Sequence, residues 1–320
     1  MRGIDFILKR TGFALITVFV AVTFNFVLFR ALPGDAITNL SKVPGASPAL
    51  RAEITKEFGL DKSKWEQYLV YLRQLSTGNL GVSFSNQEPV TSVLFRAVGN
   101  TIPMVLMGTL FSIVFGTITG VLAAWKRRTA LDYGSVSLAL TFYSLPTHFL
   151  GLMLLLLTAG YLPRGGRVDE FLYNPSFITH WVDVGKHMLL PSLTLGLVLY
   201  GQYTLVVRSA MLETLGEDFV LTARAKGLPD HTIVRRHAFR NAMLPVITLI
   251  ALSAGYIVAG SILIEKVFSW PGVGRLVSQS VEQRDWPVLQ GTFLVVTISV
   301  VFFNYVADLL YYEFDPRITT

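Results

Sequence analysis

The 320-residue chain contains no cysteine, and charged residues make up only 15% of it. Without cysteine, no disulfide can staple an extracellular domain and no thiolate can bind a soft metal. Soluble domains usually contain about 25% charged residues. The mean hydropathy of +0.52 agrees with a membrane protein. The net charge of +6 comes from Lys and Arg residues spread along the chain, which argues against a nucleic-acid partner.

Six windows without Asp, Glu, Lys or Arg, each at least 19 residues long, account for this hydropathy. Roughly 20 helical residues cross the ~30 Å hydrocarbon layer, and a helix bonds its backbone N–H and C=O groups internally. We therefore predict an all-α, polytopic membrane protein with six transmembrane helices in the lipid bilayer. The windows are Thr11 to Phe29, Ala97 to Trp125, Tyr133 to Pro163, Met188 to Val207, Asn241 to Ile264 and Trp286 to Ala307.

The distribution of basic residues predicts the orientation. We expect residues 1–10 and 313–320 to be cytoplasmic and residues 11–31 to form an uncleaved first helix, because no small residues stand at signal-cleavage spacing. The cytoplasmic segments then hold 13 Lys or Arg residues and the two short outer loops hold six, as the positive-inside rule requires. The 13 are Arg2, Lys9, Arg10, Lys126, Arg127, Arg128, Arg208, Arg224, Lys226, Arg235, Arg236, Arg240 and Arg317; the six are Arg164, Arg167, Lys186, Lys266, Arg275 and Arg284.

Residues 32–96 predict a small helical domain on the outer side, between the first and second spans. Pro48 is placed to begin a helix that Gly59 ends, and Ser63 to Glu66 forms a capping box that opens a second helix. A third helix, Pro89 to Val98, leads into the second span. Helices of this amphipathic kind cover each other, the membrane surface or a partner.

Residues 208–240 form the longest segment on the inner side, between the fourth and fifth spans. Apolar residues at helical spacing predict an amphipathic helix outside the bilayer, and Gly227 and Pro229 then break the chain before Asp230 caps a second helix. Two interpretations are open: a cytosolic docking element with small residues at its centre, or a helix on the membrane surface. The apolar residues are Leu212, Leu215, Phe219 and Ala223 in the first helix, and Ile233, Val234 and Ala238 in the second.

No motif for catalysis or metal binding emerges. The chain lacks the Gly-x-x-x-x-Gly-Lys-Ser/Thr loop that cradles nucleotide phosphates and the His-Glu-x-x-His motif of metalloproteases. His180, Asp183 and His187 suit either an outer metal site or a solvated loop, and the loop is favoured. We therefore predict no catalytic residue, no bound metal and no cofactor on this chain.

Polar and helix-breaking residues gather in the third window, which suits a bent, water-lined helix and disfavours a purely structural role. An ion-coupled carrier is the rival class, but carriers need ionisable residues near the bilayer midplane. Asp308, near the inner end of the sixth span with an asparagine one turn earlier, is better explained as part of a helix-packing polar pair. The predicted pathway residues are Thr141, Ser144, Pro146 and His148, although an interior position explains His148 equally well.

Short motifs follow one another in fixed order along nearly the whole chain. They include Pro33-Gly34-Asp35, Phe58-Gly59-Leu60-Asp61, Gly78-Asn79-Leu80-Gly81, Asp218 to Gly227, His237 to Pro245, Arg284-Asp285-Trp286-Pro287 and Asp315-Pro316-Arg317-Ile318. In their order and spacing these motifs resemble those of permease subunits of bacterial ABC importers, more narrowly the dipeptide, oligopeptide and nickel permease family.

This resemblance implies a type I importer permease fold, with a transmembrane permease core over residues 97–312. It also implies that residues 208–240 contain a coupling helix that sits in a cleft of an ATPase subunit. The chain departs from the general importer signature, because Leu221-Thr222-Ala223 stands where Glu-Ala-Ala is usual. The residues implied for coupling are Phe219, Val220, Thr222, Ala223, Arg224, Ala225, Lys226 and Gly227.

The resemblance further implies the partners and the location. These are a second homologous permease subunit in a heterodimer, two cytosolic ATP-binding subunits that hold ATP and Mg, an extracytoplasmic solute-binding protein, and the bacterial inner membrane. Peptides are the favoured solute, because the expected pathway offers no carboxylate or thiolate cluster for a metal. Nickel or another small solute is the alternative, and an ion-coupled secondary transporter is less favoured.

Overall fold

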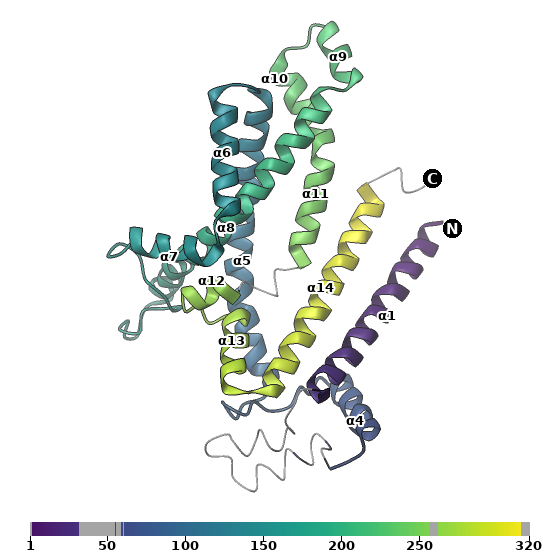
Figure 1. The fold of residues 1–320 in the computed structure, drawn as a ribbon, viewed down its shortest axis with the longest axis vertical. Helices are drawn as coiled ribbons and strands as arrows, with labels where there is room; N and C mark the ends of the chain where they lie inside the picture. The colour runs from purple at the N-terminus through teal and green to yellow at the C-terminus, as the bar shows by residue number, and fades with distance from the viewer. Residues whose placement is uncertain (1, 32–54, 56–58, 60, 256–261, 315–320) are drawn as a thin grey trace. The chain divides into compact units, whose positions relative to one another are not determined.

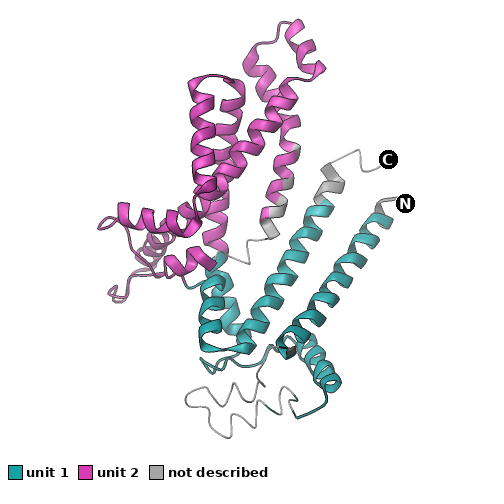
Figure 2. Ribbon diagram, viewed as in Figure 1, with its two compact units in different colours: residues 1–101, 271–320 teal, residues 102–270 magenta. Residues whose placement is uncertain are grey.

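The structure, a computed structural model, describes residues 2–31, 55, 59, 61–255 and 262–314; its helices are labelled in Figure 1. Within these residues the regular structure is helical, with one isolated β-bridge between Val82 and Pro89. The predicted all-α class is confirmed. The chain divides into two compact units, residues 1–101 with 271–320, and residues 102–270 (Figure 2).

In the first unit, α1 (Arg2–Ala31) packs along α14 (Trp286–Phe314). The ring of Phe29 lies 6.2 Å from that of Trp286, and Arg10 Nη1 lies 3.1 Å from Asp308 Oδ2. Asp308 therefore takes part in helix packing, as predicted. Its ion-pair partner is Arg10 of α1, which the sequence pattern did not indicate.

The capping box predicted at Ser63 and Glu66 is confirmed. Helix α4 (Lys64–Ser76) begins after Ser63, whose Oγ accepts the Glu66 N–H at 3.4 Å while its own N–H donates to Glu66 Oε2 at 3.0 Å. The ring of Tyr68, on the buried side of α4, lies 5.1 Å from that of Phe26 in α1. The helix predicted to start at Pro48 lies outside the described residues.

A buried carboxylate ties residues 83–85 to the start of α14. Asp285 is 1% exposed, and its Oδ2 accepts hydrogen bonds from the hydroxyls of Ser83 at 2.5 Å and Ser85 at 2.8 Å. Its Oδ1 accepts the backbone N–H of Phe84 at 3.2 Å. These partners are uncharged, and burial of the carboxylate is offset by several hydrogen bonds at once.

Two of the long helices extend well beyond their charge-free windows. Helix α5 (Val90–Trp125) includes the predicted helix that leads into the second span, and α8 (Phe177–Leu215) has 39 residues. At ~1.5 Å per residue, α8 is about twice as long as the hydrocarbon layer is thick. Its two ends therefore project into the interfaces or the aqueous phase.

The third window is not one straight span. It forms α6 (Ala130–Ser144) and α7 (Thr147–Leu157), which meet at an angle of 105°. Proline cannot donate a backbone hydrogen bond and pushes the preceding residue out of the helical region, and Leu145 before Pro146 is extended, with ψ of 133°. The predicted bend at Pro146 is confirmed, but it is too sharp for α6 and α7 to form one straight span.

The predicted number of six spans is only partly confirmed. Four helices of the described residues have the length and composition to cross a membrane, and the bent pair makes five. The fifth window contributes α11 (Phe239–Gly255) and the start of α12 (Ile262–Val267), but residues 256–261 between them lie outside the described part. The four helices are Asp5–Arg30, Val90–Trp125, Phe177–Leu215 and Trp286–Leu309.

In the second unit, α8 packs closely against both α5 and α6. A Cβ added to Gly116 of α5 would lie 2.6 Å from the Cβ of Tyr203 in α8, and one added to Gly201 of α8 would lie 2.4 Å from the carbonyl oxygen of Ala139 in α6. Small residues permit such close approach between membrane helices. These three helices form the frame that carries residues 208–240.

Candidate functional site

Helix α8 runs without a break into the 208–240 segment and ends at Leu215. Gly216 caps it, Glu217 is extended with ψ of 150°, and α9 (Asp218–Ala225) follows. The prediction of one amphipathic helix through Leu212 and Ala223 is therefore wrong. Leu212, Leu215 and Ala223 pack inward as predicted, but the chain turns at Gly216 and Glu217, so that Val220 is buried in α9 and the predicted Phe219 is exposed.

One side of α9 is fixed to the rest of the unit. Val220 is 0% exposed and Ala223 is 5% exposed, and both pack with Ile233 and Leu215 in a small apolar cluster. Full burial of an aliphatic side chain contributes about 1.5–3 kcal/mol. Two of the predicted coupling residues, Val220 and Ala223, thus hold α9 in place through their buried contacts.

The other side of α9 is exposed, and it carries the remaining predicted residues. Phe219, a predicted coupling residue, is 39% exposed, and its neighbour Leu221 is 57% exposed; both are large apolar side chains. Isolated exposed apolar residues are common, but here two lie beside basic groups on one short helix. The other exposed residues are Thr222, Arg224, Ala225, Lys226 and Gly227.

Gly227 ends α9 in a left-handed turn. Its φ is +74°, its N–H donates to the Arg224 carbonyl at 2.9 Å, and the Leu228 N–H donates to the Ala223 carbonyl at 3.3 Å. This pair of bonds is the Schellman motif that closes many helices at glycine. A Cβ at Gly227 would meet no atom within 4 Å, so backbone conformation, and not close contact, requires glycine here within this chain.

The return helix begins at Asp230. Its segments are α10 (Asp230–Thr232), the wider π-helical turn η1 (Ile233–Ala238) and then α11. The residue before it, Pro229, occupies the cap position without a side-chain hydrogen bond, so the prediction that Asp230 caps this helix is wrong. The predicted apolar residues Ile233, Val234 and Ala238 are buried.

The predicted pathway residues lie at the break between α6 and α7 and not near the 208–240 segment. All four side chains are exposed in the isolated chain, and the Thr141 hydroxyl donates to the Ser137 carbonyl at 2.9 Å within its own helix. The arrangement brings them to one bend. They are Thr141, Ser144, Pro146 and His148.

The favoured prediction of a solvated loop around His180, Asp183 and His187 is wrong, because all three residues lie in α8 and His187 is 7% exposed. His187 Nδ1 lies 3.0 Å from the Asp183 carbonyl and 3.4 Å from Asp183 Oδ1, one turn earlier in α8. Metal sites need three or more ligands around one point, and no group of three His, Asp or Glu residues occurs among the described residues.

One polar contact of this unit was missed by the sequence interpretation. Asp132, in the first turn of α6, is 2% exposed and accepts two hydrogen bonds from Arg208 of α8. Arg208 was counted as a positive-inside residue, and Asp132 stands one residue before a charge-free window. The sequence did contain a signal for this contact: an aspartate stands beside one apolar span and an arginine stands at the end of another.

Comparison with known proteins identifies two matching families and one similar structure. The family described as "Binding-protein-dependent transport system inner membrane component" matches residues 116–320, and the N-terminal family of such membrane components matches residues 3–105. A chain from a structure titled "Inward facing conformations of the MetNI methionine ABC transporter" aligns with a TM-score of 0.55 and 18% identity, covering 71% of this chain and 98% of that one. At this identity the likeness concerns the fold alone.

Similar sequences cover nearly the full length. The "Dipeptide transport system permease protein DppB" of Escherichia coli K12 is 38% identical over 98% of both chains. The "Di/tripeptide transport system permease protein DppB" of Pseudomonas aeruginosa is 36% identical over 98% of both chains. The "Glutathione transport system permease protein GsiC" of Escherichia coli is 32% identical over 98% of this chain and 99% of that protein. The chain therefore belongs to the family of inner membrane components of binding-protein-dependent transport systems.

Proposed function

We propose that this chain is a membrane permease subunit of an ATP-driven peptide importer and that α9 with Gly227 docks an ATPase subunit. The observation that carries the proposal is the two-sided construction of α9. Val220 and Ala223 anchor the buried side, while Leu221 leaves apolar surface exposed and Phe219 is partly exposed at the opposite edge of the helix. A segment held rigidly but left half uncovered is suited to bind a partner with little loss of conformational entropy.

The charges of α9 indicate which groups the docking cleft of the ATPase subunit should carry. Glu217 and Asp218 stand at its start, and Arg224 and Lys226 stand at its end. We expect apolar groups of the partner against Leu221 and acidic groups near Arg224 and Lys226, because complementary charges orient a docking interface. Thr222 and Ala225 are small enough to let the partner approach the helix backbone.

Energy for transport is proposed to come from two cytosolic ATP-binding subunits that hold ATP and Mg. This chain has no phosphate-binding loop in its sequence. Closure of the ATPase subunits would move α9 and shift the permease between outward-open and inward-open conformations. In this scheme the chain binds no nucleotide and catalyses no reaction.

Peptides are the proposed solute. Relatives named for dipeptide, di/tripeptide and glutathione transport support a peptide class, since glutathione is itself a tripeptide. Nickel or another small solute is the alternative within the same importer class. An ion-coupled carrier is disfavoured because it would have only His148 and Asp308 as candidate proton-binding residues, and Asp308 is paired with Arg10.

The complete importer would contain a second homologous permease and an extracytoplasmic solute-binding protein in the bacterial inner membrane. We propose that both termini face the cytoplasm and that residues 33–96 face outward, from the distribution of Lys and Arg. The polar bend with Thr141, Ser144, Pro146 and His148 would line half of the pathway. Single cysteines at Ser63 and Glu217 should react with an impermeant reagent from opposite faces, and reaction of both from one face would overturn this orientation.

The docking proposal is tested with Leu221→Asp in the assembled importer. We expect normal amounts of the chain in the membrane, at least tenfold lower recovery of the ATPase subunits on pull-down, and loss of uptake of radiolabelled dialanine. Val281→Asp is the matched control, because Val281 is 59% exposed on α13 (Val273–Gln283) and Leu221 is 57% exposed. Normal ATPase recovery with Leu221→Asp would exclude α9 as the docking site.

A further inference from the structure

A bidentate ion pair joins the first turn of α6 to the end of α8. Arg208 Nε donates to Asp132 Oδ1 at 2.6 Å, and Arg208 Nη2 donates to Asp132 Oδ2 at 3.0 Å. The side chain of Asp132 is 3% exposed and that of Arg208 is 26% exposed. Two parallel hydrogen bonds between a guanidinium and a carboxylate fix both distance and orientation, which a single contact does not.

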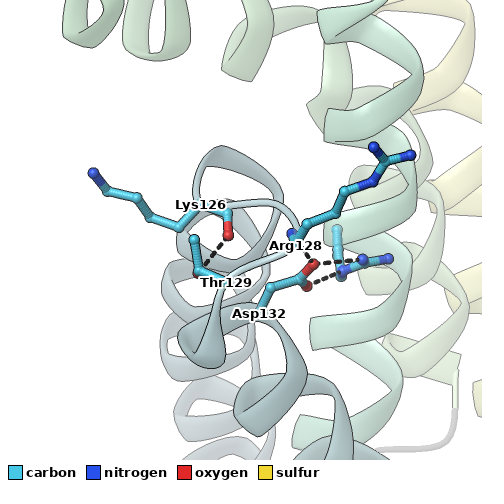
Figure 3. A network of polar contacts seen from close by, with 5 residues as sticks. Lys126, Arg128, Thr129 and Asp132 are labelled. Carbon is cyan, nitrogen blue, oxygen red and sulfur yellow. Dashed lines mark hydrogen bonds and ion pairs between the residues drawn. The ribbon is translucent and has the colours of Figure 1, made fainter.

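The same carboxylate also fixes the turn between α5 and α6. Arg128 has a φ of +63°, an unfavourable region for a non-glycine residue, and its N–H donates to Asp132 Oδ2 at 2.9 Å. The Thr129 hydroxyl donates to the Lys126 carbonyl at 2.6 Å, which closes the turn (Figure 3). Asp132 therefore connects three parts of the unit: the α5–α6 turn, α6 and α8.

Arg208 is placed where α8 leaves the packed frame for α9. Only seven residues, about 10 Å of helix, separate Arg208 from the end of α8 at Leu215. Val207 and Met211, one residue before and three residues after Arg208, are 0% exposed and belong to an apolar cluster with Ala238 of the return helix. A displacement of α9 would thus reach α8 first, and α6 through Arg208 in addition to the helix packing at Gly201.

We propose that Asp132 and Arg208 are positioning residues for coupling, which make α6 and α8 move as one body when α9 is displaced. The inference rests on the proposed docking role of α9. Without the pair, α8 would still follow the ATPase, but α6 and its bend at Pro146 would follow incompletely. ATP would then be hydrolysed with little solute transported.

The direct test measures a distance. Spin labels at Ser137 of α6 and Glu213 of α8, both exposed and introduced as cysteines into this cysteine-free chain, report whether the two helices move together. In the assembled importer we expect one narrow distance distribution in the nucleotide-free and ATP-bound states, and a broadened or shifted ATP-bound distribution with Asp132→Asn. A change in the distance in the unsubstituted importer on ATP binding would overturn the proposal.

The functional test measures dialanine transported per ATP hydrolysed. We expect Asp132→Asn to lower this ratio at least fivefold while membrane abundance and ATPase recovery stay normal, and Asp132→Glu to restore part of it. Asp308→Asn, which removes the ion pair between α14 and Arg10 of α1, is the control and should keep the ratio. An unchanged ratio with Asp132→Asn would exclude the positioning role. The docking role of α9 is tested separately, because normal ATPase recovery with Leu221→Asp would exclude that role and not the positioning role.

Discussion

The 208–240 segment and the 83–85 loop are both held by a buried aspartate, but through different chemistry. Asp132 binds the guanidinium of Arg208, while Asp285 accepts hydrogen bonds from hydroxyls and backbone N–H groups of residues 83–85. Loss of one partner of a charge pair leaves a buried charge, whereas a carboxylate shared among several neutral donors loses one bond at a time. The two regions should therefore respond differently to single substitutions.

The largest effect is expected for Arg208→Leu. It leaves the Asp132 carboxylate, 3% exposed, without its cation, which costs about 3–5 kcal/mol of stability. Asp132→Asn should cost less, because the Arg208 side chain is 26% exposed and can turn toward water. Melting temperatures in detergent compare the two variants. Equal losses would show that the asymmetry in burial does not matter.

A smaller effect is expected for Asp285→Asn. The amide retains one oxygen as an acceptor but turns its NH2 group toward donors, and a hydrogen bond to a charged group contributes about 1.5–3 kcal/mol. Hydrogen exchange at the Phe84 and Ser85 amides should accelerate. Ser85→Ala, which removes one donor to Oδ2, is the milder companion variant. Unchanged exchange in Asp285→Asn would mean that Asp285 does not hold this loop.

Gly227→Ala should destabilise the 208–240 segment by about 1–2 kcal/mol, because alanine is strained at a φ of +74° even though the site has open space. Gly185→Ala in α8 is the matched control, since its Cβ also meets no atom within 4 Å but its φ is not left-handed. We expect this control to be neutral or slightly stabilising. The melting temperature should fall for Gly227→Ala and stay equal or rise for Gly185→Ala. The same shift in both variants would argue against the left-handed turn.

The smallest effect concerns Glu66, the exposed counterpart of the two buried aspartates. Hydrogen bonds from the Ser63 hydroxyl and backbone N–H lower the pKa of Glu66 below its ordinary value of 4.5. The lowered pKa means that the ionised form favours folding, so its contribution is complete above pH 4.5 and disappears as the pH falls through the folded-state pKa. The difference in melting temperature between the parent chain and Ser63→Ala should shrink over this range. A difference that stays constant down to pH 3 would assign the effect to the hydroxyl bond and not to ionisation.

Local patterns predicted several elements correctly because the relevant energies are local. Ser63 and Glu66 satisfy each other's backbone groups, Pro146 lacks the N–H that would continue α6, and Gly227 terminates α9 through its own φ. Predictions failed where two local signals competed. The apolar spacing from Leu212 to Ala223 suits one helix, but Gly216 and the extended Glu217 divide it.

The all-α membrane class, the family motifs and the amphipathic character of residues 208–240 can be predicted from the sequence, because hydrophobicity and backbone chemistry depend on neighbouring residues. Which carboxylate meets which partner becomes visible only in the packed structure. Asp132 and Arg208 are 76 residues apart, and Asp285 lies 202 residues from Ser83. Such pairs depend on how helices pack, and the close approach of α8 to α6 at Gly201 brings the first pair within hydrogen-bonding distance.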